Sequence, residues 1–257
     1  MDGSVIAAIA AGAVMAGFVQ GLSGFAFGLV AMSVWAWTLE PQLAAMLALS
    51  GALTGQVVAA LTVRRGFDLA RLAPFVVGGL VGIPLGIVVL PLLDIQMFRA
   101  LLGILLVVWC PFMLLAPNLP PVTFGGGTAD GVAGLLGGVL SGLGGFSGMF
   151  PTLWCTLRRM DKDTQRSIIQ NFNLTMLSCA MAAHVASGSV TRDMLPMIAL
   201  AASAMLVPSL LGARLYIGIS EAAFRRIVLS LLTVSGVALL ASSLPHLLSG
   251  GGERPPT

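Results

Sequence analysis

Charged side chains are scarce in this sequence. Only 9% of its 257 residues are charged, against about 25% in an ordinary globular domain. Hydrophobic residues make up 57% of the chain, and the mean hydropathy is +0.99. Too few polar side chains remain to cover a water-soluble domain of this length, so lipid must be part of the solvent. This composition excludes a soluble enzyme, a nucleic-acid-binding protein and a disordered protein.

Other absences exclude common kinds of site. The three cysteines, Cys110, Cys155 and Cys179, lie in separate apolar runs without C-x-x-C spacing, which favours small buried hydrophobic residues over a disulfide or metal site. Every acidic residue lies near the end of an apolar run, so a carboxylate proton relay is poorly supported. We therefore expect no metal, no cofactor and no catalytic residues. Strand-type alternation is also missing, which argues against a β-barrel.

What is present is a series of long apolar segments. A bilayer core requires about 20 apolar residues per helix. Segments of that kind cover residues 4–38, 41–63, 69–92, 96–116, 126–157, 167–187, 194–217 and 224–247. The sequence therefore predicts an all-α integral membrane protein, with residues 1–257 as one polytopic domain.

The segments form two tandem copies of one unit. At an offset of 121 residues, Gly17, Gly21, Leu22, Gly24 and Phe25 match Gly138, Gly142, Leu143, Gly145 and Phe146. We place repeat one at 4–116, repeat two at 126–247 and a short linker at 117–125. Each repeat opens with a stretch too long for one span and rich in glycine at its middle. We expect a break there into two half-helices that form a hairpin, followed by three full spans.

A hairpin that returns to its own side, followed by three spans, gives an odd number of crossings. The second copy must then be inverted. The basic loops agree: they follow the second segment of repeat one and precede the corresponding segment of repeat two. Cytoplasmic loops carry an excess of Lys and Arg, so the basic loops at 64–71, 158–166 and 225–226 are assigned to the cytoplasm and both termini to the outside. Arg99 alone departs from this pattern.

The two glycine-rich breaks, here named the elbows, are the candidate substrate site. Unwound backbone at membrane depth is tolerated where it lines a cavity, and transporters of inverted repeats bind substrate at such breaks. The candidate residues are Gln20, Gly21, Ser23, Gly24, Phe25, Ser141, Gly142, Gly144, Gly145 and Ser147 in the elbows, and Gln56, Asn171 and Asn173 in the following segments. Close helix packing is the alternative reading of the elbow serines and glycines. For Gln56, Asn171 and Asn173, hydrogen bonding between helices is equally open.

Two motifs outside this set favour structural roles. Gly78-x-x-x-Gly82-x-x-x-Gly86 and Gly134-x-x-x-Gly138-x-x-x-Gly142 are typical of close contacts between membrane helices. His184 lies alone near the end of its segment, which favours a structural histidine near a loop over a proton relay.

The paired elbows resemble the sulfite exporter TauE/SafE family. The resemblance rests on G-x-x-x-G-L-S-G-F at Gly17–Phe25, G-x-x-x-G-L-G-G-F at Gly138–Phe146 and R-G-F-D at Arg65–Asp68, and it extends from about Ile6 to Leu247. It implies a multi-pass transporter in the bacterial inner membrane that exports small sulfur-containing or organic anions, such as sulfite or sulfoacetate. Gly144 stands where the first elbow has Ser23, so a site made by both elbows is asymmetric.

The sequence prediction is therefore an anion transporter that works by alternating access around the elbows, with a small anion and the bilayer as its partners. A passive anion channel could use the same elbows. A structural membrane subunit would move no anion. An intramembrane serine protease is the alternative from another class, with Ser23 in a G-x-S-G pattern and His184 as base, but the second elbow lacks the serine. Neither the particular anion nor the oligomeric state follows from the sequence.

Overall fold

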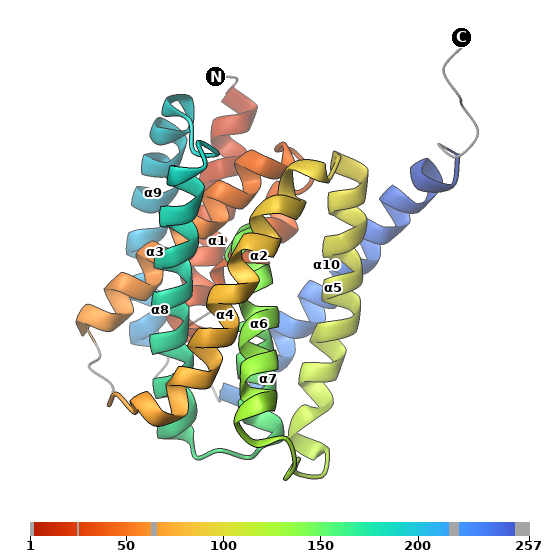
Figure 1. Ribbon diagram of the computed structural model, residues 1–257. Coiled ribbons are helices and arrows are strands. Elements are labelled where there is room, and N and C mark those ends of the chain that lie inside the picture. The colour runs from red at the N-terminus through yellow and green to blue at the C-terminus, as the bar shows by residue number, and fades with distance from the viewer. Residues whose placement is uncertain (1–2, 25, 63–65, 216–220, 250–257) are drawn as a thin grey trace.

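The computed structural model describes residues 3–24, 26–62, 66–215 and 221–249, where every regular element is a helix (Figure 1). The first half contains α1 (Gly3–Ser23), α2 (Phe27–Trp35), α3 (Pro41–Thr62), α4 (Leu69–Val89), the 3-10 turn η1 (Leu90–Leu92) and α5 (Ile95–Leu115). The 3-10 turn η2 (Ala116–Asn118) follows. The second half contains α6 (Gly126–Gly144), α7 (Met149–Leu157), α8 (Lys162–Ala186), the 3-10 turn η3 (Arg192–Met194), α9 (Leu195–Leu215) and α10 (Glu221–Ser249).

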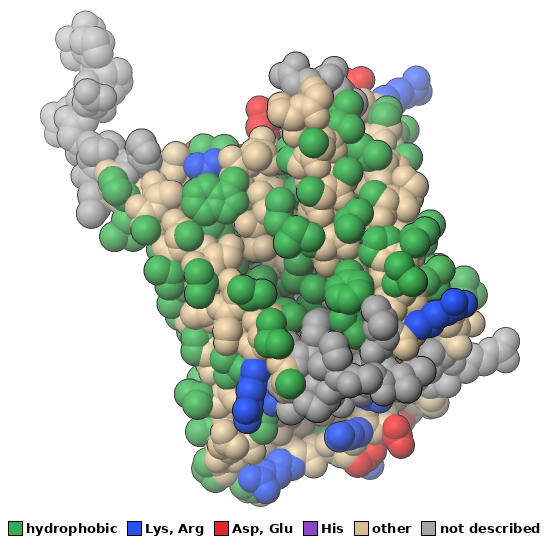
Figure 2. All heavy atoms as spheres, turned by 180° about the vertical axis from the view of Figure 1, so that it is seen from behind, with side chains coloured by type: hydrophobic (Ala, Val, Ile, Leu, Met, Phe, Trp, Pro, Cys, Tyr) green, Lys and Arg blue, Asp and Glu red, His purple; other side chains and the backbone are tan. Residues whose placement is uncertain are grey.

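The predicted all-α membrane class is confirmed. Within the described ranges, six helices are long and apolar enough to cross a membrane: α1, α3, α4, α5, α9 and α10. α6 and α8 fall outside this set because α6 is rich in glycine and α8 carries a polar run that includes Gln170, Asn171 and Asn173. Hydrophobic side chains cover the middle of the face seen in Figure 2.

Each half begins with a long helix and a short one, and then continues with three helices. The break between the first two differs in position from the expected division into two half-helices. α1 has 21 residues and α2 has 9, while α6 has 19 and α7 has 9. The first helix of each hairpin is therefore nearly a full span, because the glycine that ends it lies well beyond the middle of the apolar stretch.

Helices of the first half pack in pairs against helices of the second half. α4 lies along α6, and α1 lies along α9, while α5 and α10 lie side by side (Figure 1). Glycine makes the first contact close: a Cβ on Gly82 or Gly86 would run into the backbone carbonyls of Leu135 or Val139. The predicted packing role of these small-residue motifs is confirmed. The contact of α1 with α9 is of the same kind, since a Cβ on Gly17 would lie 2.6 Å from the carbonyl oxygen of Met205.

The loops that carry the basic residues lie at one end of the molecule. The hydroxyl of Ser167, at the start of α8, donates to the carbonyl oxygen of Gly66, before α4. Figure 2 shows Lys and Arg side chains gathered at its lower end. Arg99 lies at the start of α5, where its guanidinium donates to the carbonyl oxygens of Ala36 (2.7 Å) and Trp37 (3.1 Å). This arginine closes the turn between α2 and α3, which accounts for its departure from the charge pattern.

Candidate functional site

The two elbows have the same backbone geometry. Gly24 has φ +81° and Gly145 has φ +80°, a left-handed conformation that glycine adopts without the steric cost of a Cβ. The Gly24 N–H donates to the carbonyl oxygen of Gln20 (2.7 Å), and the Gly145 N–H donates to that of Ser141 (3.1 Å). Both helices thus end on a left-handed glycine cap. The match found in the sequence is a match in structure at these two positions.

A tryptophan holds each short helix back against the long one. In the first hairpin the indole N–H of Trp35 donates to the carbonyl oxygen of Ala8 (3.1 Å). In the second, the indole N–H of Trp154 donates to Asp130 Oδ1 (2.6 Å), and Nη1 of Arg158 contacts both carboxylate oxygens (2.8 and 3.0 Å). The second hairpin therefore closes on a charged contact where the first has a single neutral hydrogen bond.

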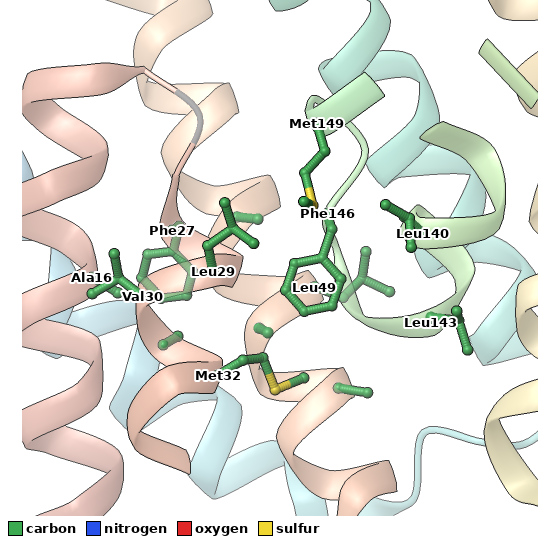
Figure 3. Close-up of a cluster of buried hydrophobic side chains, with 14 of the residues drawn as sticks. Ala16, Phe27, Leu29, Val30, Met32, Leu49, Leu140, Leu143, Phe146 and Met149 are labelled. Carbon is green, nitrogen blue, oxygen red and sulfur yellow. The ribbon is translucent and has the colours of Figure 1, made fainter. Parts of the chain in front are cut away.

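The fold brings the two hairpins together. A Cβ on Gly28, in the first turn of α2, would lie 3.1 Å from the Phe146 ring and 3.2 Å from the Gly145 carbonyl oxygen. On its other side Gly145 lies against the backbone of Leu49 in α3. Figure 3 shows Phe27, Leu29 and Met32 of α2 gathered with Phe146 and Met149 in one buried apolar cluster. The space between the elbows is filled by these side chains.

Polar side chains of the first elbow are engaged in holding it. Gln20 Oε1 accepts from the Phe27 N–H (3.0 Å) and so caps the start of α2. Gln56 Nε2 donates to the Gly24 carbonyl oxygen (2.6 Å), which is a hydrogen bond between α3 and the elbow. The Ser23 hydroxyl donates to Val19 (2.8 Å) and accepts from the Ala26 N–H (3.2 Å). Phe25 lies outside the described residues.

The second elbow contains both engaged and unengaged polar atoms. The Ser147 hydroxyl donates to Asn173 Oδ1 (2.9 Å), and both side chains are buried. Ser141 is fully buried, and its hydroxyl has no hydrogen-bond partner among the described residues. His184 is also buried: its Nε2 lies 2.9 Å from the Gly142 carbonyl oxygen, and its Nδ1 has no partner.

The remaining candidates from the sequence are Asn171 and three glycines, of which Gly142 is the residue that contacts His184. Asn171 Nδ2 donates to the Ser167 carbonyl oxygen (3.0 Å) and faces the loop at Gly66. Gly21 packs against α9 at Ser209, and Gly142 packs against α4 at Ile83. Gly144 lies between Met32 and Phe146. The structure thus joins Ser147 with Asn173 and Gln56 with Gly24, and it leaves Asn171 at the basic end.

His184 is the residue that sequence reasoning undervalued. As expected it lies near a loop, in the last turn of α8, and it also packs against the end of α6. A signal was present in the sequence: Asn173, Leu177, Ala180 and His184 are spaced so that they share one face of a helix, and all four are buried.

A family model described as sulfite exporter TauE/SafE matches residues 9–239. The chain belongs to this family. Comparisons with curated proteins and with solved structures found no match. Membership confirms the resemblance carried by the paired elbow motifs, and it makes the chain a member of a family of membrane exporters.

The geometry gives no support to the protease alternative. His184 is hydrogen-bonded to Gly142 and not to Ser23, so no base is placed at the serine. Among the described residues, no three His, Cys, Asp or Glu side chains are grouped so that they could hold a metal ion.

The two ends of the protein differ in charge. A groove of about 460 Å³ at the basic end is lined by Arg71, by Arg158 and by the Asp130 carboxylate that pairs with Arg158. A groove of about 390 Å³, lined by residues of the α2–α3 turn, η1 and the start of α5, includes the carboxylates of Glu40 and Asp94. In the first groove two guanidinium groups are accompanied by one carboxylate, whereas the charged groups of the second groove are both carboxylates.

Proposed function

We propose that this protein is a carrier that exports a small sulfur-containing or organic anion, such as sulfite or sulfoacetate, across the bacterial inner membrane. The observation that carries the proposal is the pair of matched left-handed breaks at Gly24 and Gly145. They lie at the turns of two hairpins that pack against each other in the interior. Broken helices of this kind recur where transporters bind their substrates.

The chemistry of the second elbow suits an anion. The residue before α7, Gly148, offers no side-chain cap, although the Met149 N–H donates to the Phe146 carbonyl oxygen (3.2 Å), whereas the Gln20 side chain caps the start of α2. An uncapped helix N-terminus carries a partial positive charge. The Ser147–Asn173 pair lies beside this end, because a Cβ on Gly148 would lie 2.9 Å from Asn173 Nδ2. Polar side chains and a positive helix end thus converge on one buried position.

Charge at the two ends favours export. Arg158 in the groove at the basic end is paired with Asp130, and the more exposed Arg71 lies beside Asp68, so the excess of positive charge in that groove is small. The positive-inside pattern assigns this end to the cytoplasm. An anion is attracted there and is repelled by Glu40 and Asp94 at the other groove. Release on the carboxylate side then has a lower chance of rebinding.

Alternating access would follow from an inverted repeat. In this proposal α4–α6 and α9–α1 are corresponding contacts, and the two halves rock about the helices that meet at the centre, α3 and α8. The glycine-lined contacts let helix backbones slide with few side chains to repack. The first elbow is exposed at Gly24 while the second is buried at Gly145, which is the asymmetry expected of a carrier open on one side.

Counterflow in proteoliposomes tests the proposal. Purified protein is reconstituted, vesicles are loaded with sulfite or sulfoacetate, and uptake of labelled anion is followed. A carrier gives saturable uptake that is accelerated by internal anion. Large single-channel currents without counterflow would instead establish a channel, and absence of any flux would leave only a structural role.

A matched pair of variants ties transport to the elbow. Gly24→Ala and Gly188→Ala each place a Cβ on a left-handed residue (φ +81° and +76°) with open space around it. The backbone strain is therefore similar, but only Gly24 lies in an elbow. We expect Gly24→Ala to slow transport and Gly188→Ala, in the turn after α8, to leave it near the wild-type rate. Equal rates would argue against the elbow as the moving part.

A further inference from the structure

Two polar atoms without a protein partner lie at the end of α6. Ser141 is 0% exposed and His184 is 1% exposed. The Ser141 hydroxyl and His184 Nδ1 form no hydrogen bond with the described chain. Both residues belong to the contact between α6 and α8, because His184 Nε2 is bonded to Gly142, the residue that follows Ser141. Buried polar atoms are nearly always hydrogen-bonded, so two such atoms at one helix contact make it a candidate for a ligand.

The hydrogen bond to Gly142 defines the tautomer of His184. A carbonyl oxygen only accepts, so Nε2 must carry the proton in the 2.9 Å contact. Nδ1 is then an acceptor in the neutral ring and a donor in the protonated ring. An oxyanion next to Nδ1 needs a donor, which only the protonated ring provides.

The charged groups of the described helices around His184 lie toward the helix ends. The helices packed against α8 are α3, α4, α6 and α7. Their titratable side chains, with those of α8 and the adjoining turns, are Arg71, Asp130, Cys155, Arg158, Arg159, Asp161, Lys162, Asp163, Arg166, Cys179, Arg192 and Asp193. The charged ones belong to the helix ends and turns, and no carboxylate lies on α8 between Arg166 and His184. Among the described residues near His184, none offers a carboxylate to the imidazolium, and a bound anion would supply that partner.

We propose that Ser141 and His184 bind the transported oxyanion together with one proton. The imidazolium Nδ1–H and the Ser141 hydroxyl donate to oxygens of the anion, while Nε2–H stays on Gly142. Neither the proton nor the anion is stable at this position alone, so the two move as a unit. This inference rests on the proposed export function and adds its coupling ion and its two ligand side chains.

Two variants separate ligand binding from structure. Gln in place of His184 keeps an N–H at the position of Nε2 for Gly142 and removes the group that takes up the proton. Ala in place of Ser141 removes an unpaired buried hydroxyl, so the fold should be as stable as the wild type or more stable. Thr152→Val is the matched control, since the Thr152 hydroxyl is also buried and unpaired but lies in α7.

The experiment measures sulfite flux into proteoliposomes with and without an imposed pH gradient, with an internal pH dye reporting proton movement. In the wild type we expect the gradient to drive sulfite and protons together. His184→Gln should lose this driving, and Ser141→Ala should raise KM by about tenfold at unchanged thermal stability. Thr152→Val should behave as the wild type.

The failures are distinguishable. Wild-type flux that is saturable but unaffected by the gradient, or a wild-type KM and gradient response in both variants, would overturn this inference and leave the exporter intact. Absence of sulfite and sulfoacetate flux in the wild type would overturn the proposed function and this inference with it. If His184→Gln does not fold, the KM of Ser141→Ala decides the result.

Discussion

The two hairpins share a backbone and differ in what their polar atoms do. In α1–α2 the amides of Gln20 and Gln56 and the hydroxyl of Ser23 bond the elbow itself. In α6–α7 the elbow is buried, and Ser141 and His184 each present an atom with no protein partner. The duplicated glycines therefore supply the break in both hairpins. The polar side chains around the first elbow stabilise its backbone, whereas those around the second include groups that could bind a ligand.

The largest difference is expected for alanine at the two cap glycines. Gly145→Ala combines left-handed strain with a Cβ 2.9 Å from the Leu49 Cα, whereas Gly24→Ala meets nothing within 4 Å. We expect losses of about 3 kcal/mol at Gly145 and about 1 kcal/mol at Gly24. Thermal unfolding in detergent measures both. Equal losses would mean that the second elbow is no more tightly packed than the first.

The hydrogen bonds that hold each short helix against the long one should show the next largest difference in stability between the two hairpins. Asp130→Asn removes the charge that holds Arg158 and weakens the acceptor for Trp154, while Trp35→Phe removes one hydrogen bond to Ala8. Since Arg158 is partly exposed, we expect about 2 kcal/mol for Asp130→Asn and about 1 kcal/mol for Trp35→Phe. A double-mutant cycle of Asp130 with Arg158 gives the coupling. A coupling near zero would mean that the contact between Asp130 and Arg158 does not stabilise the second hairpin.

A change at Gln56 tests whether the polar side chains of the first elbow serve stability and not substrate binding. Gln56→Leu leaves the Gly24 carbonyl oxygen without its 2.6 Å donor, but Gly24 is exposed and water can replace it. We expect a loss of about 0.5–1 kcal/mol in stability, with the KM for sulfite unchanged. A KM raised severalfold at unchanged stability would place Gln56 on the substrate path instead.

The smallest expected effect concerns the start of α8. Asp161 accepts from Thr164, and these hydrogen bonds hold the pKa of its exposed carboxyl below the usual value. Its contribution is present above the unfolded-state pKa and is lost as pH falls through the lower folded-state pKa. Amide exchange in the first turn of α8 should then accelerate at acid pH, while Asp161→Asn should abolish that dependence. The first turn of α5, which Asp94 caps in the same way through Gln96 and Met97, serves as the internal control for the Asp161 variant.

The elbows were predictable from sequence because a left-handed cap requires glycine, and duplicated glycines mark it twice. The packing of Gly82 and Gly86 was predictable for a similar reason, since close contact needs small residues. The position of the break within each hairpin could not be predicted, because no neighbouring residue indicates which glycine adopts the left-handed conformation. The partners of Asp130 and His184 were also hidden, since they come from distant helices and depend on tertiary packing. The inverted orientation of the repeats stays a prediction.

The most direct test of the account compares Ser141→Ala with Ser23→Ala in sulfite counterflow. Both changes remove one hydroxyl from an elbow, but Ser23 is bonded to Val19 and Ala26 whereas Ser141 is not bonded to the protein. The account predicts a KM about tenfold higher for Ser141→Ala and a KM close to wild type for Ser23→Ala. A raised KM for Ser23→Ala with no change for Ser141→Ala would contradict it.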